Sequence, residues 1–362
     1  MLLQWLNEVP IPHLMPHSEP GRMDKRFHEK MWLIDAETDH GVAIVGGLNI
    51  ANEYFRVDPG DADSFWRDQD VIVKGEVIGD MVTAFDRNFD YFIAIKKSRG
   101  IFNTNLYWDK TRAVLDVTGK VKFTFRTDPR LDKKVRQMAS KRLLLDYQAS
   151  AVRFFQNRPR YKETYIGQAY LKLITRAQNE ILIANAYFVP SEAFIDAVKN
   201  AARRCVGITI ITNSTQTNDL PEITMTGRES YQEMLSVNSE TVVNNCNKKQ
   251  AAGIEIWEWQ GKHRDSQERT EGTMHSKYAV FDNIISLVGS YNLDPRSEKL
   301  NSESALVFEN ARLAKTLARL FRNNDLAFSQ RISMVKAKQF LHPTDPVYIL
   351  EKSVGDWFKD EL

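Results

Sequence analysis

Two histidines, His28 and His275, each stand two residues before a lysine in similar surroundings. The first copy is FHEKMWLIDAETDHGVAIVGGLNIANEYF and the second is MHSKYAVFDNIISLVGSYNLDPRS. Both copies contain His-x-Lys, four further residues, an Asp, a gap and then Gly-small-x-Asn. These positions are His28, Lys30, Asp35, Gly46, Gly47 and Asn49 in the first copy, and His275, Lys277, Asp282, Gly289, Ser290 and Asn292 in the second. We interpret the pattern as an internal repeat.

Paired imidazoles and ammonium groups suit chemistry at a phosphodiester. One neutral imidazole attacks phosphorus, while a second, protonated imidazole donates its proton to the departing alkoxide. Two Lys and two Asn donors can stabilise the five-coordinate transition state without a metal ion. Histidine suits both roles because its unperturbed pKa allows both protonation states near neutrality. The repeat therefore predicts a covalent phosphohistidine, no cofactor and a bell-shaped pH profile.

Alternation of polar and apolar residues places each motif on a β-strand. Residues two apart share one face of a strand, so His28 and Lys30 lie side by side, as do His275 and Lys277. We expect a strand from 275 to 282 and a second one through 287 and 288, joined by a turn. The opposite face of each strand is apolar and can face a core.

The second half of the chain alternates strand and helix patterns. We expect strands at 180–188, 207–212 and 253–259, a helix at 191–204 and a long polar helix at 229–250. Such alternation favours an α/β fold with mainly parallel sheets flanked by helices. Only 27 residues precede His28, so the first lobe is expected to lack its opening strands and helices.

Composition sets the broad class of protein. Apolar residues make up 43% and charged residues 27% of the 362 residues, which is typical of a packed globular fold. Cys205 and Cys246 lie far apart without a CxxC spacing, which suggests neither a disulfide framework nor a zinc site and favours a reducing compartment. No metal site is expected, because the other histidines show no ligand spacing. The segment 130–162 is rich in Lys and Arg, which suits either an anionic lipid surface or a solvated connecting helix.

The two motifs resemble the paired HKD motifs of the phospholipase D superfamily. Further stretches resemble bacterial cardiolipin synthases, especially the C-type branch: IVGGLNIANEYF, WRDQDVIVKGEVI, YFVP, TNSTQTND and GSYNLDPRSEKLNSE. The resemblance implies two similar α/β lobes that share one site. We divide the chain into a partial first lobe at 1–129, a basic connecting segment at 130–162, a second lobe at 163–330 and a C-terminal tail at 331–362.

The same resemblance assigns roles around the motifs. It implies that an acidic residue orients each histidine, and Glu303 and Asp68 match these positions, with Asp70 as a competitor for Asp68. It implies that the motif residues Asp35 and Asp282 are structural. Ser290 and Gly47 occupy equivalent positions next to the substrate, and Gly47 lacks the hydroxyl donor.

Tyr187 is a candidate for lining a substrate groove, although strand-end aromatic residues more often pack in cores. By analogy with the family, His28 is the expected nucleophile and His275 the general acid. The reverse order stays open.

These observations predict a phosphatidyltransferase of cardiolipin-synthase type. Its expected substrates are phosphatidylglycerol and, as a second candidate, phosphatidylethanolamine. We expect peripheral contact with the cytoplasmic face of a bacterial inner membrane and no nucleic acid as substrate. One alternative is a phospholipase D or nuclease that hydrolyses with the same residues. Another is a non-catalytic lipid-binding protein or an inactive fragment. The sequence identifies no protein partner.

Overall fold

The computed structural model describes residues 27–56, 65–98, 148–246 and 252–343, together with residues 349, 352 and 353. Among them, residues 82–98 and Gln148 belong to one compact unit, and the others belong to a second unit. Both histidine motifs lie in this second unit. Most of the basic connecting segment, residues 130–147, lies outside the described residues.

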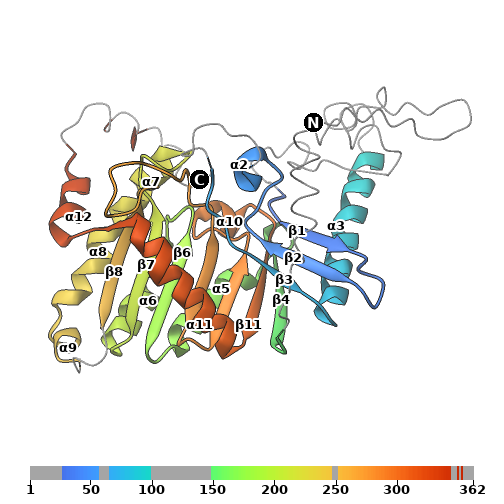
Figure 1. Ribbon diagram of the computed structural model, residues 1–362, viewed down its shortest axis with the longest axis horizontal. Helices are drawn as coiled ribbons and strands as arrows, with labels where there is room; N and C mark the ends of the chain where they lie inside the picture. The colour runs from blue at the N-terminus through green and yellow to red at the C-terminus, as the bar shows by residue number, and fades with distance from the viewer. Residues whose placement is uncertain are drawn as a thin grey trace, which may run out of the picture. The chain divides into compact units, whose positions relative to one another are not determined.

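Two β-sheets form the frame of the second unit (Figure 1). The smaller sheet has the order β1-β2-β3, formed by β1 Met31–Ile34, β2 Val42–Gly46 and β3 Asp70–Val73. The larger sheet has the order β12-β8-β7-β6-β9-β10-β11-β4-β5. Its strands are β4 Ala151–Arg158, β5 Glu163–Thr164, β6 Glu180–Asn185, β7 Gly207–Asn213, β8 Gly253–Trp259, β9 Lys277–Phe281, β10 Ile285–Gly289, β11 Glu303–Glu309 and β12 Ser329–Arg331.

Helices connect and cover these strands. The α-helices are α2 Asn52–Phe55, α3 Val77–Ser98, α5 Tyr165–Arg176, α6 Glu192–Arg203, α7 Pro221–Gly227, α8 Tyr231–Ser236, α9 Thr241–Asn244, α10 Pro295–Lys299, α11 Ala311–Leu320 and α12 Met334–Leu341. Shorter helical turns are η3 Pro159–Tyr161, η4 Arg228–Ser230, η5 Val237–Ser239, η6 Phe321–Asp325 and η7 Leu326–Phe328. Helix α3 begins in the second unit and continues into the first.

The expected α/β class is confirmed, and the larger sheet is mixed. Strands β6, β7 and β8 pair in parallel, because helical segments return the chain between them. Strands β9, β10 and β11 pair antiparallel. The motif strands β9 and β10 form a hairpin, which requires antiparallel pairing.

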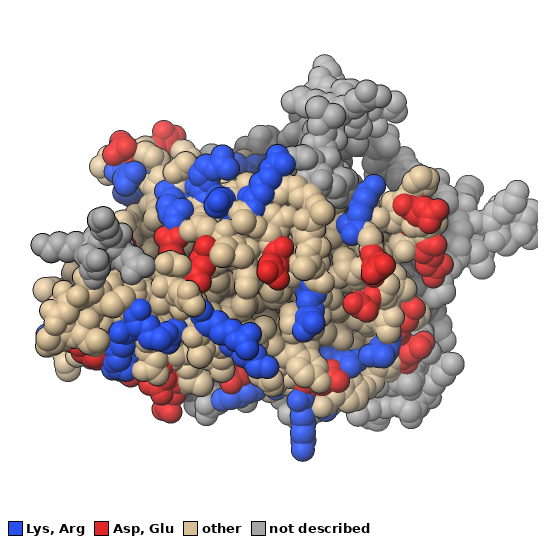
Figure 2. All heavy atoms as spheres, turned by 90° about the horizontal axis from the view of Figure 1, so that it is seen from below, with Lys and Arg blue, Asp and Glu red and all other residues tan. Residues whose placement is uncertain are grey.

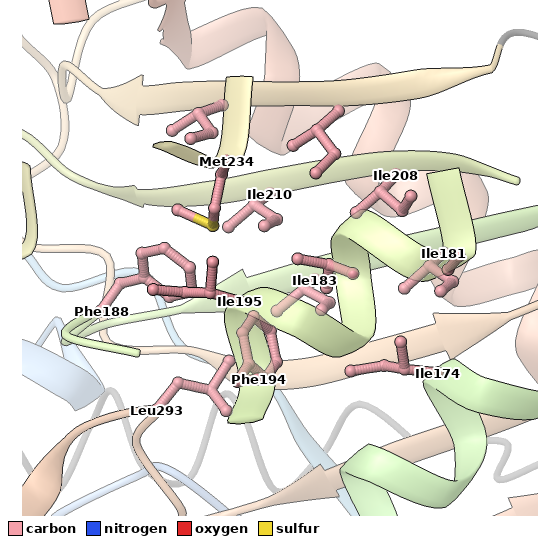
Figure 3. Packing of buried hydrophobic residues seen from close by; sticks show 14 of the residues in the cluster. Ile174, Ile181, Ile183, Phe188, Phe194, Ile195, Ile208, Ile210, Met234 and Leu293 are labelled. Atoms are coloured by element: carbon pink, nitrogen blue, oxygen red, sulfur yellow. The ribbon is translucent and has the colours of Figure 1, made fainter. Parts of the chain in front are cut away.

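The core follows the alternation of the strands. Ile181 and Ile183 of β6 and Ile208 and Ile210 of β7 are buried on one face, where Phe194 of α6 packs with them (Figure 3). Helices α5 and α8 cover the same face with further apolar side chains.

The other face of the sheet is covered by α11 and η6. Tyr278 of β9 meets Phe321 with ring centroids 6.3 Å apart. Leu317 and Ala318 of α11 are buried beside it. A sheet covered on both faces holds the ends of its central strands in fixed positions.

The expected long helix at 229–250 is wrong, because residues 229–246, the part that the structure describes, form a series of short helices. The chain leaves the helical conformation at Glu240, where φ is −70° and ψ is 139°. The hydroxyls of Ser236 and Ser239 donate to carbonyls three residues earlier, at Glu233 and Ser236. Such side-chain bonds compete with helix continuation.

The expectation from the cysteine spacing that the chain has no disulfide is also wrong. Cys205 and Cys246 form a disulfide with a Cα–Cα distance of 5.5 Å. Cys205 follows α6 and Cys246 follows α9, so the bond joins two helix ends that are 41 residues apart in sequence. Sequence spacing missed the pair because only the fold brings these ends together.

Removing this disulfide should lower stability. Cys205→Ser is expected to lower the free energy of unfolding by about 2–4 kcal/mol, because the unfolded chain regains the entropy of an open loop. Urea unfolding followed by circular dichroism measures the change. Adding a reductant should destabilise the unmodified chain by a similar amount and leave the variant unchanged. Equal stability of the oxidised chain and the variant would contradict this role.

Candidate active site

The two motifs fold into the same local structure. In the first copy, Met31 of β1 pairs with Val45 of β2, and in the second copy Tyr278 of β9 pairs with Val288 of β10. In both copies, the first residue of the pair lies three positions after the motif histidine. The second lies directly before the first glycine of the motif, Gly46 or Gly289. The short helices α2 and α10 also begin at the same distance from the motif asparagines. The repeat in sequence is therefore a repeat in structure.

The candidate acids lie at the start of the next strand of each copy, with Glu303 as the first residue of β11 and Asp68 two residues before β3. Gly46 pairs with Asp70 of β3, and Gly289 pairs with Ala305 of β11. Asp68 and Glu303 each stand two residues before these partners, so they occupy equivalent positions. Asp70 instead faces the backbone of its own copy, where its Oδ1 accepts from the N–H of Leu48 at 3.4 Å.

Each acid contacts the histidine of the other copy. Nδ1 of His28 lies 2.9 and 2.8 Å from the two carboxylate oxygens of Glu303. Nδ1 of His275 lies 2.9 Å from Oδ2 of Asp68. With Nδ1 bonded to a carboxylate, Nε2 of each ring is the nitrogen left for chemistry. Because each copy supplies the acid for the histidine of the other copy, an arrangement called here the exchange of acids, the two motifs form one site.

Two backbone bridges produce the exchange. The N–H of His28 donates to the carbonyl of Ser302 at 2.9 Å, and the N–H of His275 donates to the carbonyl of Arg67 at 2.7 Å. The bridged pairs Phe27 with Ser302 and Arg67 with Met274 run parallel. Each histidine is therefore aligned with the acid of the opposite copy by the main chain itself.

Arg67 anchors one of these bridges. Its Nε and Nη2 donate to Asp325 at 3.0 and 3.3 Å. The carboxylate of Asp325 also accepts from the hydroxyl of Tyr278 at 2.6 Å. The side chain of Asp325 is fully buried. Sequence reasoning missed Arg67 and Asp325, because no motif links residues so far apart in the chain.

The two lysines are placed alike. Nζ of Lys30 donates to the carbonyl of His28 at 2.9 Å, and Nζ of Lys277 donates to the carbonyl of His275 at 2.6 Å. Burial lowers the pKa of Lys30 to about 7 and the pKa of Lys277 to about 8. Nearby carboxylates, chiefly Glu303 for Lys30, oppose this lowering. Both lysines therefore titrate close to neutral pH.

The electrostatics of the histidines show that the two copies converge. Burial lowers the pKa of His28, the charge of Glu303 opposes it, and the charges of both lysines lower it further. Burial holds the pKa of His275 well below its ordinary value, and Lys277, Lys30 and His28 add to this effect. Each ring is thus within electrostatic reach of the other copy's lysine.

The carboxylate of Glu303 accepts hydrogen bonds from two serine hydroxyls. Ser290 donates to its Oε2 at 2.6 Å, and Ser297 donates to its Oε1 at 2.8 Å. Ser297 was not predicted, but it stands five residues after Asn292, as Tyr54 stands five after Asn49.

At the position equivalent to Ser290, the first copy has Gly47. A Cβ there would lie 2.5 Å from Oδ1 of Asp68 and 2.8 Å from the carbonyl oxygen of His275. The missing side chain therefore makes room for the Asp68 carboxylate.

Gly47→Ser, which restores the serine of the second motif, is expected to impair catalysis. The new Cβ must displace Asp68 from His275, and a shift of about 1 Å in such a site costs about 100-fold in rate. Turnover of a phosphodiester substrate measures the loss. Gly79→Ser is a control, since a Cβ at Gly79 meets nothing within 4 Å. Full activity of Gly47→Ser would show that Asp68 tolerates displacement.

Aromatic rings surround His275. Its ring centroid lies 5.3 Å from Tyr54, 5.4 Å from Trp66 and 6.4 Å from Tyr187. The hydroxyl of Tyr187 donates to Asp219 at 2.7 Å. Tyr187 is a candidate from the sequence, whereas sequence reasoning missed Tyr54 and Trp66.

The motif asparagines differ in their surroundings. Asn49 is exposed, and its amide donates to the hydroxyl of Tyr54 at 2.9 Å. Asn292 is buried, and its Oδ1 has no hydrogen-bond partner among the described residues. A buried acceptor without a partner at a reactive site indicates room for a hydrogen-bond donor of a substrate, such as an alcohol hydroxyl.

The motif aspartates lie away from both histidines, at the far ends of the strands. Asp35 and Asp282 both have left-handed backbones, with φ of 48° and 54°. The carboxylate of Asp282 accepts from the N–H groups of Gln178, Asn179 and Glu180. Asp35 is exposed, and its carbonyl accepts from Thr38. Among the described residues, no three His, Cys, Asp or Glu side chains cluster as a metal site requires.

Binding of a phosphodiester should weaken steeply above neutral pH. The lysine pKa values of about 7 and about 8 mean that both ammonium groups lose their protons between pH 7 and pH 9. The affinity for glycerophosphoglycerol, whose charge is constant over this range, is expected to fall about 100-fold. Calorimetric titration at several pH values measures it. A pH-independent affinity would contradict the role of the lysines, and Lys315→Met on α11 is a control that should keep the full pH dependence.

Comparisons with known proteins show what this chain is similar to. The family described as cardiolipin synthase, PLD-like domain matches residues 170–325. An uncharacterised protein of Helicobacter pylori is 27% identical over 302 residues, which cover 81% of this chain and 56% of that protein. A cardiolipin synthase of Geobacillus thermodenitrificans is 26% identical over 283 residues, which cover 78% of this chain and 43% of that enzyme. The chain thus spans about half the length of these curated relatives.

A solved structure shares the fold. The crystal structure of phosphatidylserine synthase from Haemophilus influenzae matches with a TM-score of 0.58 at 14% identity, over 93% of this chain and 71% of that one. At this identity the likeness concerns the fold alone. The sequence matches show a chain that resembles cardiolipin synthases, with the family match confined to residues 170–325, and the structural match adds a shared fold.

Proposed function

We propose that this chain transfers a phosphatidyl group from one alcohol to another through a covalent phosphohistidine, as a cardiolipin-synthase-like enzyme. The exchange of acids carries this proposal, because it joins His28 and His275 in one site with two lysines. Such a site offers an attacking imidazole, a proton-donating imidazole and positive charge for the phosphoryl oxygens.

The reaction proceeds in two displacements. Nε2 of one histidine attacks phosphorus and the bond from phosphorus to the first alcohol breaks, while the other histidine gives its proton to the departing oxygen. The second alcohol then returns a proton to that histidine, its oxygen attacks phosphorus, and the nitrogen–phosphorus bond breaks. Lys30 and Lys277 offset the phosphoryl charge throughout, and the free Oδ1 of Asn292 can accept from the hydroxyl of an alcohol.

Lipid substrates are supported by apolar side chains next to the site. Ile50, Phe55 and Leu220 are 54%, 43% and 40% exposed, and they neighbour Asn49, Tyr54 and Asp219 in sequence. We propose phosphatidylglycerol as the first donor and phosphatidylethanolamine as the second candidate, met by peripheral contact with a bacterial membrane.

Two further observations bear on the membrane. Within the described residues, no helix has the length and apolarity that a membrane crossing requires. On the face seen in Figure 2, Lys and Arg lie among Asp and Glu rather than in one basic field. The exposed apolar side chains of Ile50, Phe55 and Leu220, rather than the face seen in Figure 2, are therefore the proposed membrane contact. The disulfide favours the oxidising side of the membrane over the cytoplasmic face expected from cysteine spacing.

Mass spectrometry of products tests the proposal. The chain is incubated with vesicles of phosphatidylglycerol, with and without phosphatidylethanolamine, and compared with His275→Asn. Cardiolipin and the free headgroup are the expected products. Phosphatidic acid alone would identify a phospholipase and refute the transferase. Cleavage of DNA without any lipid product would refute both lipid activities, and lipid binding without product would leave a non-catalytic protein.

A further inference from the structure

A cavity with polar walls, called here the polar cavity, lies at the ends of β7 and β8, where β12 and α12 meet them. Its volume is about 390 Å³, and neither histidine motif contributes to the part of its wall that the structure describes. Only Ile332 and Phe340 are apolar among the described residues that line it. Small-molecule sites of about 300–1,000 Å³ are usually lined by apolar side chains. The polar cavity is therefore suited to a small polar ligand rather than to an acyl chain.

The buried part of the polar cavity holds a guanidinium in one orientation. Nε and Nη2 of Arg228 each donate to a carboxylate oxygen of Glu258 at 2.7 Å. The guanidinium carbon lies 4.1 Å from the ring centroid of Phe340. The side chains of Arg228 and Glu258 are 9% and 4% exposed. A buried ion pair adds little to stability compared with apolar side chains of similar size, but a fixed guanidinium is well suited to bind an anion.

Positive charge exceeds negative charge around the polar cavity. Three cations line it, namely Arg228, Arg331 and Lys336, whereas the described part of the wall has one carboxylate, that of Glu258. Arg331 is paired with Glu255 at 2.9 Å. Lys336 lies on the first turn of α12 and forms no ion pair with any residue that the structure describes. The surplus positive charge favours an anionic ligand.

Side-chain amides give the polar cavity a second kind of binding group. Gln216, Gln260 and Gln330 line it, and each amide offers both a donor and an acceptor. Nε2 of Gln260 donates to the carbonyl of Glu258 at 3.0 Å. The amides of Gln216 and Gln330 form no hydrogen bond within the described part of the chain. Groups that both donate and accept match hydroxyls, which do the same, so the wall suits an anion that carries hydroxyl groups.

One loop connects the polar cavity with the candidate active site. Ser214 and Gln216, in the loop after β7, line the cavity. Three residues after Gln216, the carboxylate of Asp219 accepts from the hydroxyl of Tyr187 at 2.7 Å. The ring centroid of Tyr187 lies 6.4 Å from that of His275. A ligand in the polar cavity would therefore contact a loop that also holds an aromatic neighbour of His275.

We propose that the polar cavity binds an anionic phosphate ester of a small polyol, such as glycerol phosphate, apart from the phosphodiester that meets the two histidines. Arg228 and Lys336 bind the phosphate oxygens, and the glutamine amides bind the hydroxyls. The same chemistry occurs in free glycerol phosphate and in the headgroup of phosphatidylglycerol. The proposal goes beyond the proposed function and does not depend on it, because it concerns binding alone.

Calorimetric titration with sn-glycerol 3-phosphate tests the free ligand. Lys336→Met is expected to weaken binding by about 10- to 100-fold, because the phosphate loses a hydrogen bond from a charged donor. Lys338→Met is the matched control, since it removes a charge from the same helix at a position that does not line the polar cavity. The control variant is expected to bind as the unmodified chain does.

Sedimentation with vesicles tests the lipid headgroup as the source. The vesicles contain phosphatidylglycerol in phosphatidylcholine, and the same two variants are compared. If the headgroup is the ligand, Lys336→Met binds the vesicles several-fold more weakly than Lys338→Met. General attraction to an anionic surface affects both variants alike, because each loses one exposed charge. If Lys336→Met matches Lys338→Met with both probes, the proposal is overturned.

Amine labelling of the unmodified chain locates the ligand without any variant. Acetic anhydride acetylates exposed lysines, and mass spectrometry of peptides measures the extent at Lys336 and at Lys338, which are both exposed. The ligand, supplied as sn-glycerol 3-phosphate or as the vesicles, is expected to slow acetylation of Lys336 several-fold and to leave Lys338 unchanged. Equal labelling of Lys336 with and without both probes would overturn the proposal. Turnover of a phosphodiester by the same preparation would then leave the proposed function standing.

Discussion

Glu303→Gln is expected to lower kcat by about 10³–10⁴-fold, as removal of the charge that orients a catalytic histidine does elsewhere. The amide keeps the shape of the side chain but cannot balance an imidazolium at His28, which lies 2.8 Å away. The loss should appear in kcat more than in KM, since Glu303 supports the ring rather than the substrate. Steady-state kinetics on the lipid substrate measures it.

The exchange of acids gives this prediction a specific signature. The charge of Glu303 raises the pKa of His28, so Glu303→Gln should lower the pKa of His28 further and leave His275 nearly unchanged. Asp68→Asn should disturb His275 instead. Titration of ¹⁵N-labelled histidine by NMR separates the rings. A shift confined to His275 in Glu303→Gln would contradict the cross-connection, and Ser297→Ala, which keeps the carboxylate, is the matched control.

The second large effect concerns stability. Asp325→Ala is expected to lower the free energy of unfolding by about 3–5 kcal/mol, because it leaves the buried guanidinium of Arg67 without its charge partner. It also leaves the hydroxyl of Tyr278 without its acceptor. Activity should fall together with stability, since Arg67 holds the segment before β3 that brings Asp68 to His275. Chemical unfolding and turnover of the same preparation measure both.

An exposed ion pair is the control for Asp325. Arg331 and Glu255 lie 2.9 Å apart with side chains 58% and 40% exposed. Glu255→Ala should therefore change the free energy of unfolding by about 1 kcal/mol or less. Equal effects of Asp325→Ala and Glu255→Ala would show that the buried pair has no special role.

The local pattern of apolar and polar residues is enough to predict the motif strands and much of the strand and helix order in the second half of the chain. The strands around 180–185, 207–213, 253–259 and 277–281 were expected nearly where they lie, because apolar alternation and strand length depend on neighbouring residues. The family resemblance from the paired motifs is confirmed by the matches to cardiolipin synthases.

Features that depend on distant contacts could not be predicted in this way. Asp68 and Glu303 could be named as acids, but their exchange between the histidines follows from two backbone bridges across the chain. The disulfide has the same origin, because it joins the ends of α6 and α9. The break at Glu240 has a local cause instead, because the hydroxyls of Ser236 and Ser239 bond to carbonyls three residues earlier, and helix propensity alone does not reveal it.

The central claim is that two motifs form one phosphorus-binding site, and the stoichiometry of the trapped adduct tests it most directly. The chain is mixed with radiolabelled phosphatidylglycerol, quenched at high pH and counted for phosphoryl groups that survive base and are lost in acid. Labelling that saturates at one group per chain is the predicted result. Two groups per chain would mean two independent sites, and product formed without any such adduct would mean that no phosphohistidine exists.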